Sequence, residues 1–258
     1  MGKCGKTGKG GQEAAGGTKE LFTLSRDVRK RLRECCKEGE NGQRHVMYLW
    51  VCVCPRGIGE TPAGGDDSRR LSLQDWLNIL DEAASLGACW VVLSMTTQLS
   101  RHEDLWDICR WAQEAHGMMV GIHLVEDDVT PEETARLKQL DGDRLRLLVR
   151  RESLGKLKPL EDQGLVLWTA NPQEEDGARP RCQGPSRMIY VNAAGELFTC
   201  GLVDGLDQYR MGNALRERLR DVMRDPCVPH SVDESLHRIS SGCDGCPSLI
   251  ANFFDANL

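Results

Sequence analysis

Residues 71–94 decide the fold: they read Leu71-Ser-Leu-Gln-Asp-Trp-Leu-Asn-Ile-Leu-Asp-Glu-Ala-Ala-Ser-Leu-Gly87 and then, after two residues, Trp90-Val-Val-Leu-Ser94. In the first part apolar residues recur every three or four positions, which predicts an amphipathic helix that ends at Gly87. The second part is a short apolar run, which predicts a buried strand. A helix followed by a strand is the repeating unit of a parallel sheet.

The same alternation continues on both sides of this unit. Strands are predicted at residues 46–53, 90–95, 118–125, 145–149 and 165–169, with helices at 71–86, 103–116 and 130–140 and a short helix before the last strand. Five strands alternating with helices imply an α/β fold with a parallel sheet, either open or curved into a partial barrel. Ligands bind such sheets at the carboxyl ends of the strands. The candidate positions are Cys52, Cys54, Ser94, Thr96, His123, Glu126, Thr169 and Asn171.

Four cysteines in the last third of the chain have the spacing of a metal site: Cys182, Cys200, Cys243 and Cys246. Residues 187–200 consist of two short runs of strand-forming residues around Asn192-Ala-Ala-Gly195, which has the composition of a tight turn. A hairpin there would bring the first two thiolates near each other. The last two cysteines form a C-x-x-C knuckle. Four thiolates suit Zn²⁺ or an iron–sulfur cluster, and their spacing does not choose between them.

The alternative for a cysteine in a reduced compartment is a small, buried apolar side chain. That interpretation accounts for isolated residues such as Cys89 and Cys109. It accounts poorly for a C-x-x-C pair that lies beside glycines and is followed by Pro247. A metal site at the four cysteines is therefore the favoured interpretation.

Composition limits the class of protein. The chain has 258 residues, of which 40% are hydrophobic, so it can bury a core in one or two domains. Its net charge of −6 gives no electrostatic reason to expect a nucleic-acid partner. No apolar run approaches the roughly twenty residues that a membrane span needs, and the N-terminus lacks the apolar core of a secretory signal. Twelve cysteines without export predict a cytoplasmic protein with reduced thiols.

Shifts in composition divide the chain into four segments. Residues 1–20 are rich in Gly and Lys and are predicted to be a disordered tail. Residues 21–44 contain a basic amphipathic helix, which we expect to pack on the main domain, with docking to a partner as the alternative. Residues 45–171 form the α/β half. Residues 180–258 are predicted to form a small domain around the four cysteines.

In order and spacing, these motifs resemble a radical S-adenosylmethionine (radical SAM) protein with a C-terminal SPASM/twitch extension, over roughly residues 45–258. Residues 71–94 are similar to the family's first helix and second strand. Gly195 with Cys200, then Tyr209-Arg-Met-Gly-Asn213, then the C-x-x-C pair, are similar to the twitch subtype. The resemblance implies a partial (β/α) barrel of the radical SAM type and one auxiliary [4Fe–4S] cluster held by the four cysteines.

The chain departs from the family pattern after its first strand. The family's C-x-x-x-C-x-x-C motif holds the cluster that binds and cleaves S-adenosylmethionine, and here that place reads Trp50-Val-Cys-Val-Cys-Pro-Arg-Gly-Ile-Gly59. We expect Cys52 and Cys54 to point to opposite sides of the strand and so not to hold one iron together. The family's Gly-Gly-Glu-Pro segment is replaced by Ser94-Met-Thr-Thr97. We therefore expect neither radical initiation nor binding of S-adenosylmethionine in the family's manner.

The leading hypothesis is a radical SAM-like protein that lacks the SAM-cleaving cluster and keeps one auxiliary-type [4Fe–4S] cluster. That cluster would serve electron relay, structure, or the binding of a partner such as an intact radical SAM enzyme or its peptide substrate. One alternative is an active enzyme that binds S-adenosylmethionine or another small molecule at the barrel mouth. Another is a zinc-stapled structural or interaction protein. The barrel-mouth alternative uses Cys52, Cys54, Ser94 and Thr96, in a site rebuilt with Cys4, Cys35 or Cys36.

Overall fold

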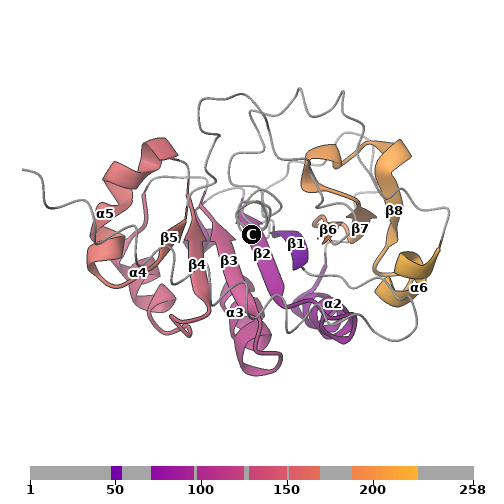
Figure 1. Ribbon diagram of the computed structural model, residues 1–258, viewed down its shortest axis with the longest axis horizontal. Helices are drawn as coiled ribbons and strands as arrows, with labels where there is room; N and C mark the ends of the chain where they lie inside the picture. The colour runs from indigo at the N-terminus through magenta and orange to yellow at the C-terminus, as the bar shows by residue number, and fades with distance from the viewer. Residues whose placement is uncertain are drawn as a thin grey trace, which may run out of the picture.

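The computed structural model describes residues 48–53, 71–95, 98–124, 128–149, 151–168 and 188–225. These residues form one eight-stranded sheet with the strand order β5-β4-β3-β2-β1-β6-β7-β8, which runs across the molecule in Figure 1. Neighbours among the first five strands pair in parallel. These strands are β1 (Tyr48–Val53), β2 (Trp90–Met95), β3 (Met119–His123), β4 (Leu145–Leu148) and β5 (Leu167–Trp168).

Helices connect these parallel strands as the sequence predicts, with ends that differ by a few residues. Helix α2 begins with a capping box in which Ser72 and Asp75 satisfy each other's backbone N–H groups. Gly87 follows the helix with a φ of 95°, a conformation that glycine adopts without steric cost. The connecting helices are α2 (Leu73–Ser85), α3 (Leu105–Glu114), α4 (Pro131–Leu137) and α5 (Leu154–Asp162).

The predicted hairpin is confirmed and extends this same sheet. Strand β6 (Met188–Val191) pairs in parallel with β1, from Tyr48↔Met188 to Val51↔Val191. Strand β7 (Glu196–Phe198) then pairs antiparallel with β6, and β8 (Arg210–Asn213) antiparallel with β7. The first strand of the α/β half is therefore the interior neighbour of the hairpin, a pairing that the sequence did not predict.

A short helix ties the end of the described chain to the α/β half. Helix α6 (Leu219–Arg224) buries Leu219, Val222 and Met223 in the same core as α2. Its first backbone N–H, on Leu219, donates to Oε2 of Glu82 at 2.7 Å. Within the described residues, none of the helices is both long and apolar enough to span a membrane.

Alternation along the strands gives the sheet two different faces. One face packs on the helices: Leu49 and Val51 of β1 share a core with Trp76 and Leu80 of α2. The other face carries large aromatic side chains, so the residues on it are set apart from those under the helices. This second core, here called the aromatic face, includes Trp50, Trp90, Trp168, Tyr190, Phe198 and Cys200.

Candidate functional site

Three polar side chains form a row across the carboxyl ends of adjacent strands. The register pairs Cys52 of β1 with Ser94 of β2, and Ser94 with His123 of β3. Each residue lies an even number of positions from a residue of the aromatic face, so all three point to that side. Adjacent strands lie about 4.8 Å apart. The three side chains are partly exposed, unlike the buried residues around them, so they present a thiol, a hydroxyl and an imidazole to solvent.

Two aromatic rings lie beneath the thiol end of this row. Trp50 and Tyr190 pair across β1 and β6 and meet edge to face, with ring centroids 5.4 Å apart. The indole N–H of Trp50 donates to Oγ of Ser94 at 2.5 Å, and the hydroxyl of Tyr190 donates to Oδ2 of Asp204 at 3.0 Å. Each ring is therefore fixed at its polar end and packed along its apolar edge.

Tyr190 is held as a hydrogen-bond donor. Burial raises the pKa of its hydroxyl well above the usual range, and the neighbouring Cys52 and Asp204 raise this pKa further. The phenol therefore stays protonated at physiological pH and keeps its bond to Asp204. Tyr190, in the first strand of the hairpin, therefore lies beside the thiol of Cys52 in β1.

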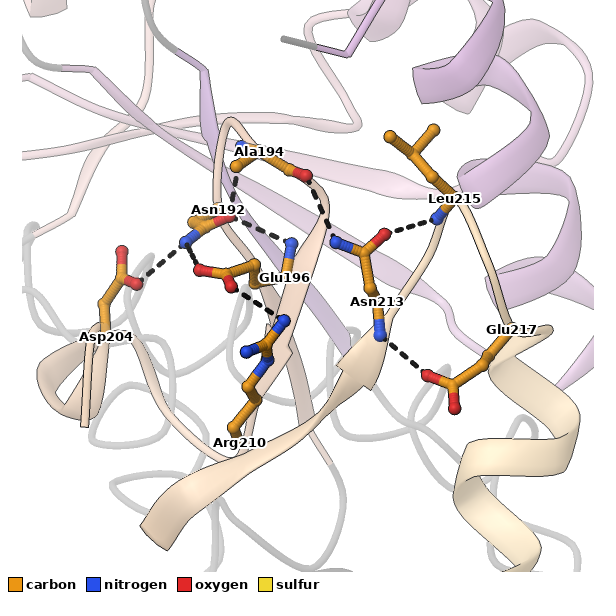
Figure 2. Close-up of polar contacts among 8 residues, drawn as sticks. All are labelled: Asn192, Ala194, Glu196, Asp204, Arg210, Asn213, Leu215 and Glu217. Atoms are coloured by element: carbon orange, nitrogen blue, oxygen red, sulfur yellow. Dashed lines mark hydrogen bonds and ion pairs between the residues drawn. The ribbon is translucent and has the colours of Figure 1, made fainter. Parts of the chain in front are cut away.

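The turn between β6 and β7 is organised by Asn192 (Figure 2). Its Oδ1 accepts from the backbone N–H groups of Ala194 and Glu196, both at 3.0 Å. Its Nδ2 donates to Asp204 at 2.9 Å and to Glu196 at 3.2 Å. Gly195 completes the turn with a φ of 80°. This amide uses both of its ends, which fixes the hairpin and orients the carboxylate of Asp204.

A second asparagine closes the far side of the same unit (Figure 2). The backbone N–H of Asn213 donates to Oε2 of Glu217 at 2.8 Å, and its Oδ1 accepts from the backbone of Leu215 at 2.9 Å. Arg210 and Glu196 form an ion pair at 2.9 Å across β7 and β8. The three-strand unit is thus braced on both sides of β7, which leads directly to Cys200.

Cys200 is the one predicted metal ligand within the described residues. It is 6% exposed and lies in the aromatic face with Trp50 and Tyr190. Cys200 follows the Tyr190↔Phe198 pair by two residues, and it shares the aromatic face with Met188, the first residue of β6. Cys182 precedes Met188 by six residues, a chain length of at most about 20 Å. Cys200 therefore lies in the same core as the first residue of β6, and Cys182 is separated from that residue by a short stretch of sequence.

The other three predicted ligands, Cys182, Cys243 and Cys246, lie outside the described residues, so the four-cysteine site stays a prediction. No group of three or more His, Cys, Asp or Glu side chains with a metal-holding arrangement occurs in the described part of the chain. Also outside it are Cys4, Cys35, Cys36, Cys54, Thr96, Glu126, Thr169 and Asn171.

The reason given for expecting Cys52 and Cys54 to point to opposite sides of the first strand does not hold, and Cys54 itself lies outside the described residues. Side chains two positions apart in a strand share a face, as Trp50 and Cys52 do here, whereas Val51 and Val53 point to the helices. Residues 52 and 54 are also two positions apart, so strand alternation gives no reason for them to point to opposite sides. The segment still has two cysteines where the family's motif has three.

Sequence reasoning missed Tyr190, Asp204 and Gly201, although it found Ser94 and Cys52. The chain does carry a signal for the first of these, since Tyr190 lies two residues before the Asn192 turn on the face that Cys200 shares. Cys109, by contrast, behaves as predicted for a packed cysteine. It is 0% exposed in α3, and burial raises the pKa of its thiol above the usual range.

Among known proteins, similarity to this chain is found in solved structures and not in family models or curated sequences. No family model matches the chain, and no curated protein matches it. The chain is similar to BtrN in complex with AdoMet and 2-DOIA, with 13% identity and a TM-score of 0.49 over 71% of this chain and 84% of that one. It is similar to Streptococcus suis SuiB bound to S-adenosylmethionine, with 12% identity and a TM-score of 0.46 over 86% and 72%. SuiB bound to its precursor peptide SuiA gives 12% and 0.47 over 86% and 73%. The likeness concerns the course of the chain and not its chemistry.

Proposed function

We propose that this protein is a radical SAM-like iron–sulfur protein in which Cys182, Cys200, Cys243 and Cys246 hold one [4Fe–4S] cluster. The observation that carries the proposal is the hairpin. It has the predicted turn and pairing, and Cys200, which follows it, lies in the same core as Met188, six residues after Cys182 in the sequence. A hairpin that forms where the sequence predicts it supports the proposal more strongly than cysteine spacing alone.

The surroundings of Cys200 are compatible with such a cluster, because a bound metal takes up the charge that burial would otherwise penalise in a thiolate. Trp50, Tyr190 and Phe198 share the core in which this cysteine lies, and it is 6% exposed. Bound by four thiolates, a [4Fe–4S] cluster supplies one-electron transfer, with a potential that depends on burial and on hydrogen bonds to sulfur. The protein's part is to supply one thiolate from a braced hairpin and to exclude water around it.

The role we propose for the cluster is electron relay or structural support for a partner, and not radical initiation. The motif that holds the family's initiating cluster has two cysteines here instead of three. The partner would be an intact radical SAM enzyme or its peptide substrate. Co-purification of the protein with such an enzyme in its cluster-loaded form, and not in the apo form, is the expected outcome.

Metal analysis of the anaerobically purified protein tests the proposal. We expect about four iron and four sulfide per chain and a brown colour. The Cys200→Ser variant should lose this iron. The control is Cys89→Ser, which changes a partly exposed cysteine packed against the same aromatic face and should retain the iron. A colourless protein with one zinc per chain would instead support the zinc-stapled alternative. A protein with neither metal would reject both.

A second function is favoured by the row of Cys52, Ser94 and His123. These side chains are partly exposed at the carboxyl ends of parallel strands, where small molecules bind sheets of this kind. A small-molecule enzyme would use this row, with S-adenosylmethionine as the first ligand to test. Calorimetric titration decides: binding that Ser94→Ala weakens supports the second function, and no heat with any concentration of S-adenosylmethionine refutes that ligand.

A further inference from the structure

The turn that follows Cys200 lies directly on the two rings beneath the polar row. A Cβ atom at Gly201 would come within 2.9 Å of Cη2 of Trp50 and within 2.9 Å of Cε2 of Tyr190. Real Cβ atoms do not approach other atoms so closely, so a side chain cannot be added unless something moves. The backbone of Gly201 is not among those with positive φ, so space and not backbone conformation requires glycine here.

The two rings cannot easily give way. Trp50 is 7% exposed and its indole N–H is bonded to Ser94, while Tyr190 is 4% exposed and its hydroxyl is bonded to Asp204. Movement of either ring would break a partly buried hydrogen bond as well as the edge-to-face contact between the two rings. The turn itself is closed by a bond from the backbone N–H of Val203 to the carbonyl of Cys200 at 3.2 Å. A side chain at position 201 would therefore displace the turn, and Cys200 with it.

We infer that Trp50 and Tyr190 are positioning residues for Cys200: they form a seat, contacted through Gly201, that sets where the ligating sulfur lies. This inference rests on the proposed function, and it goes further by assigning the sulfur's placement to rings on β1 and β6. Because one ring belongs to the first strand of the α/β half, the metal site depends on that strand as well as on the hairpin. Groups that orient metal ligands typically contribute a factor of about 10 to 100 in metal affinity.

The test compares loss of iron to a chelator from the cluster-loaded, full-length protein. Gly201→Ala should release iron about tenfold faster than the wild type, the lower end of the effect of groups that orient ligands. Gly155→Ala is the matched control, because Gly155 has nothing within 4 Å of an added Cβ and no positive φ. It should release iron at the wild-type rate. Equal rates for Gly201→Ala and the wild type would overturn the inference.

A second pair of variants keeps the test decisive if Gly201→Ala does not fold. Trp50→Phe removes the ring edge that contacts Gly201 and the bond to Ser94, so it should also release iron faster, with an altered visible circular dichroism of the cluster. In the double variant Trp50→Phe/Gly201→Ala, the added methyl occupies space that the indole vacates. The two effects should then be less than additive. A Trp50→Phe protein with wild-type release and spectrum, or strictly additive effects, would refute the seat.

The outcome separates this inference from the proposal on which it rests. A wild-type protein that holds no metal refutes the proposed function before any variant is compared. A wild-type protein that holds a cluster, with variants that release iron at the same rate, leaves the proposed function standing and removes the seat. The Tm of each variant is measured beside its rate of iron release. Faster release at an unchanged Tm reflects a local change in the placement of Cys200, whereas faster release with a lowered Tm reflects a general loss of stability.

Discussion

We predict that the side chain of Glu133 by itself makes a large contribution to the free energy of unfolding of the α/β half. It is 2% exposed, and its carboxylate accepts from the backbone N–H of Thr130 at 2.8 Å and of Ser100 at 2.6 Å. The first bond completes the capping box of α4. The second reaches the turn η1 (Leu99–Arg101), which follows β2, so one side chain joins two loops.

The expected loss of stability follows from the backbone N–H donors that Glu133→Ala would leave without an acceptor. Glu133→Ala leaves two backbone N–H groups without their acceptor, at about 1–3 kcal/mol each where they remain buried. Partial hydration of the loops lowers the sum, so we expect a loss of about 3 kcal/mol in the free energy of unfolding, at the upper end of ordinary single substitutions. For a chain of this size that corresponds to roughly 6–12 °C in Tm. Glu132→Ala, an exposed neighbour in the same turn, should cost about 0.5 kcal/mol.

The contribution of Glu133 depends on pH in a defined direction. Burial acts to raise the pKa of its carboxyl, but the N–H donors of Thr130 and Ser100 outweigh it and hold the pKa below its usual value of 4.5. The carboxylate's contribution is thus fully present above pH 4.5 and is lost as pH falls through the folded-state pKa. Chemical denaturation at neutral pH and below pH 4 measures this. A Glu133→Ala variant no less stable than Glu132→Ala, or a difference that widens in acid, would refute the reasoning.

Three further predictions test other joints of the structure. Asn192→Asp keeps the shape of the side chain but turns a carboxylate oxygen toward Glu196 and Asp204; urea denaturation should show a loss of about 2 kcal/mol that shrinks in acid, and an unchanged stability would contradict the network of Figure 2. Glu82→Ala removes the acceptor for the first N–H of α6, which should cost about 1 kcal/mol and speed amide exchange in α6 before it does so in β2; equal protection of α6 would count against the tie. Cys109→Ser places a hydroxyl in a fully buried site and should lower stability by about 1–3 kcal/mol, while the native Cys109 thiol should resist alkylation until the protein unfolds; rapid labelling of the folded protein would show the burial to be wrong.

Local patterns predicted the helices and strands because their causes are local. The apolar spacing of residues 71–86, the capping box at Thr130 and the turn at Asn192 each act over a few residues, and all three are present in the structure. The pairing of β6 with β1 has no such local cause. It joins residues about 140 positions apart, and no sequence pattern in either strand identifies the strand with which it pairs.

The candidate sites divide in the same way. Ser94 and Cys52 could be predicted because each lies next to the carboxyl end of a parallel strand, the place where such sheets bind ligands. The need for glycine at position 201 could not, because its cause is a pair of rings that arrive from β1 and β6. No local pattern distinguishes Gly201 from other glycines, because the two rings that require it belong to other segments of the chain.

Strand β1 connects both candidate sites. Its neighbours are β2 on one side and β6 on the other. Its residues Trp50 and Cys52 point to one face, where the first lies against the turn of Cys200 and the second begins the polar row. A slip of one residue in β1 would turn both side chains toward the helices. The register of this strand therefore sets the seat of the proposed metal ligand and the composition of the polar row at once, so the two sites are coupled through the backbone of the sheet even though they differ in chemistry.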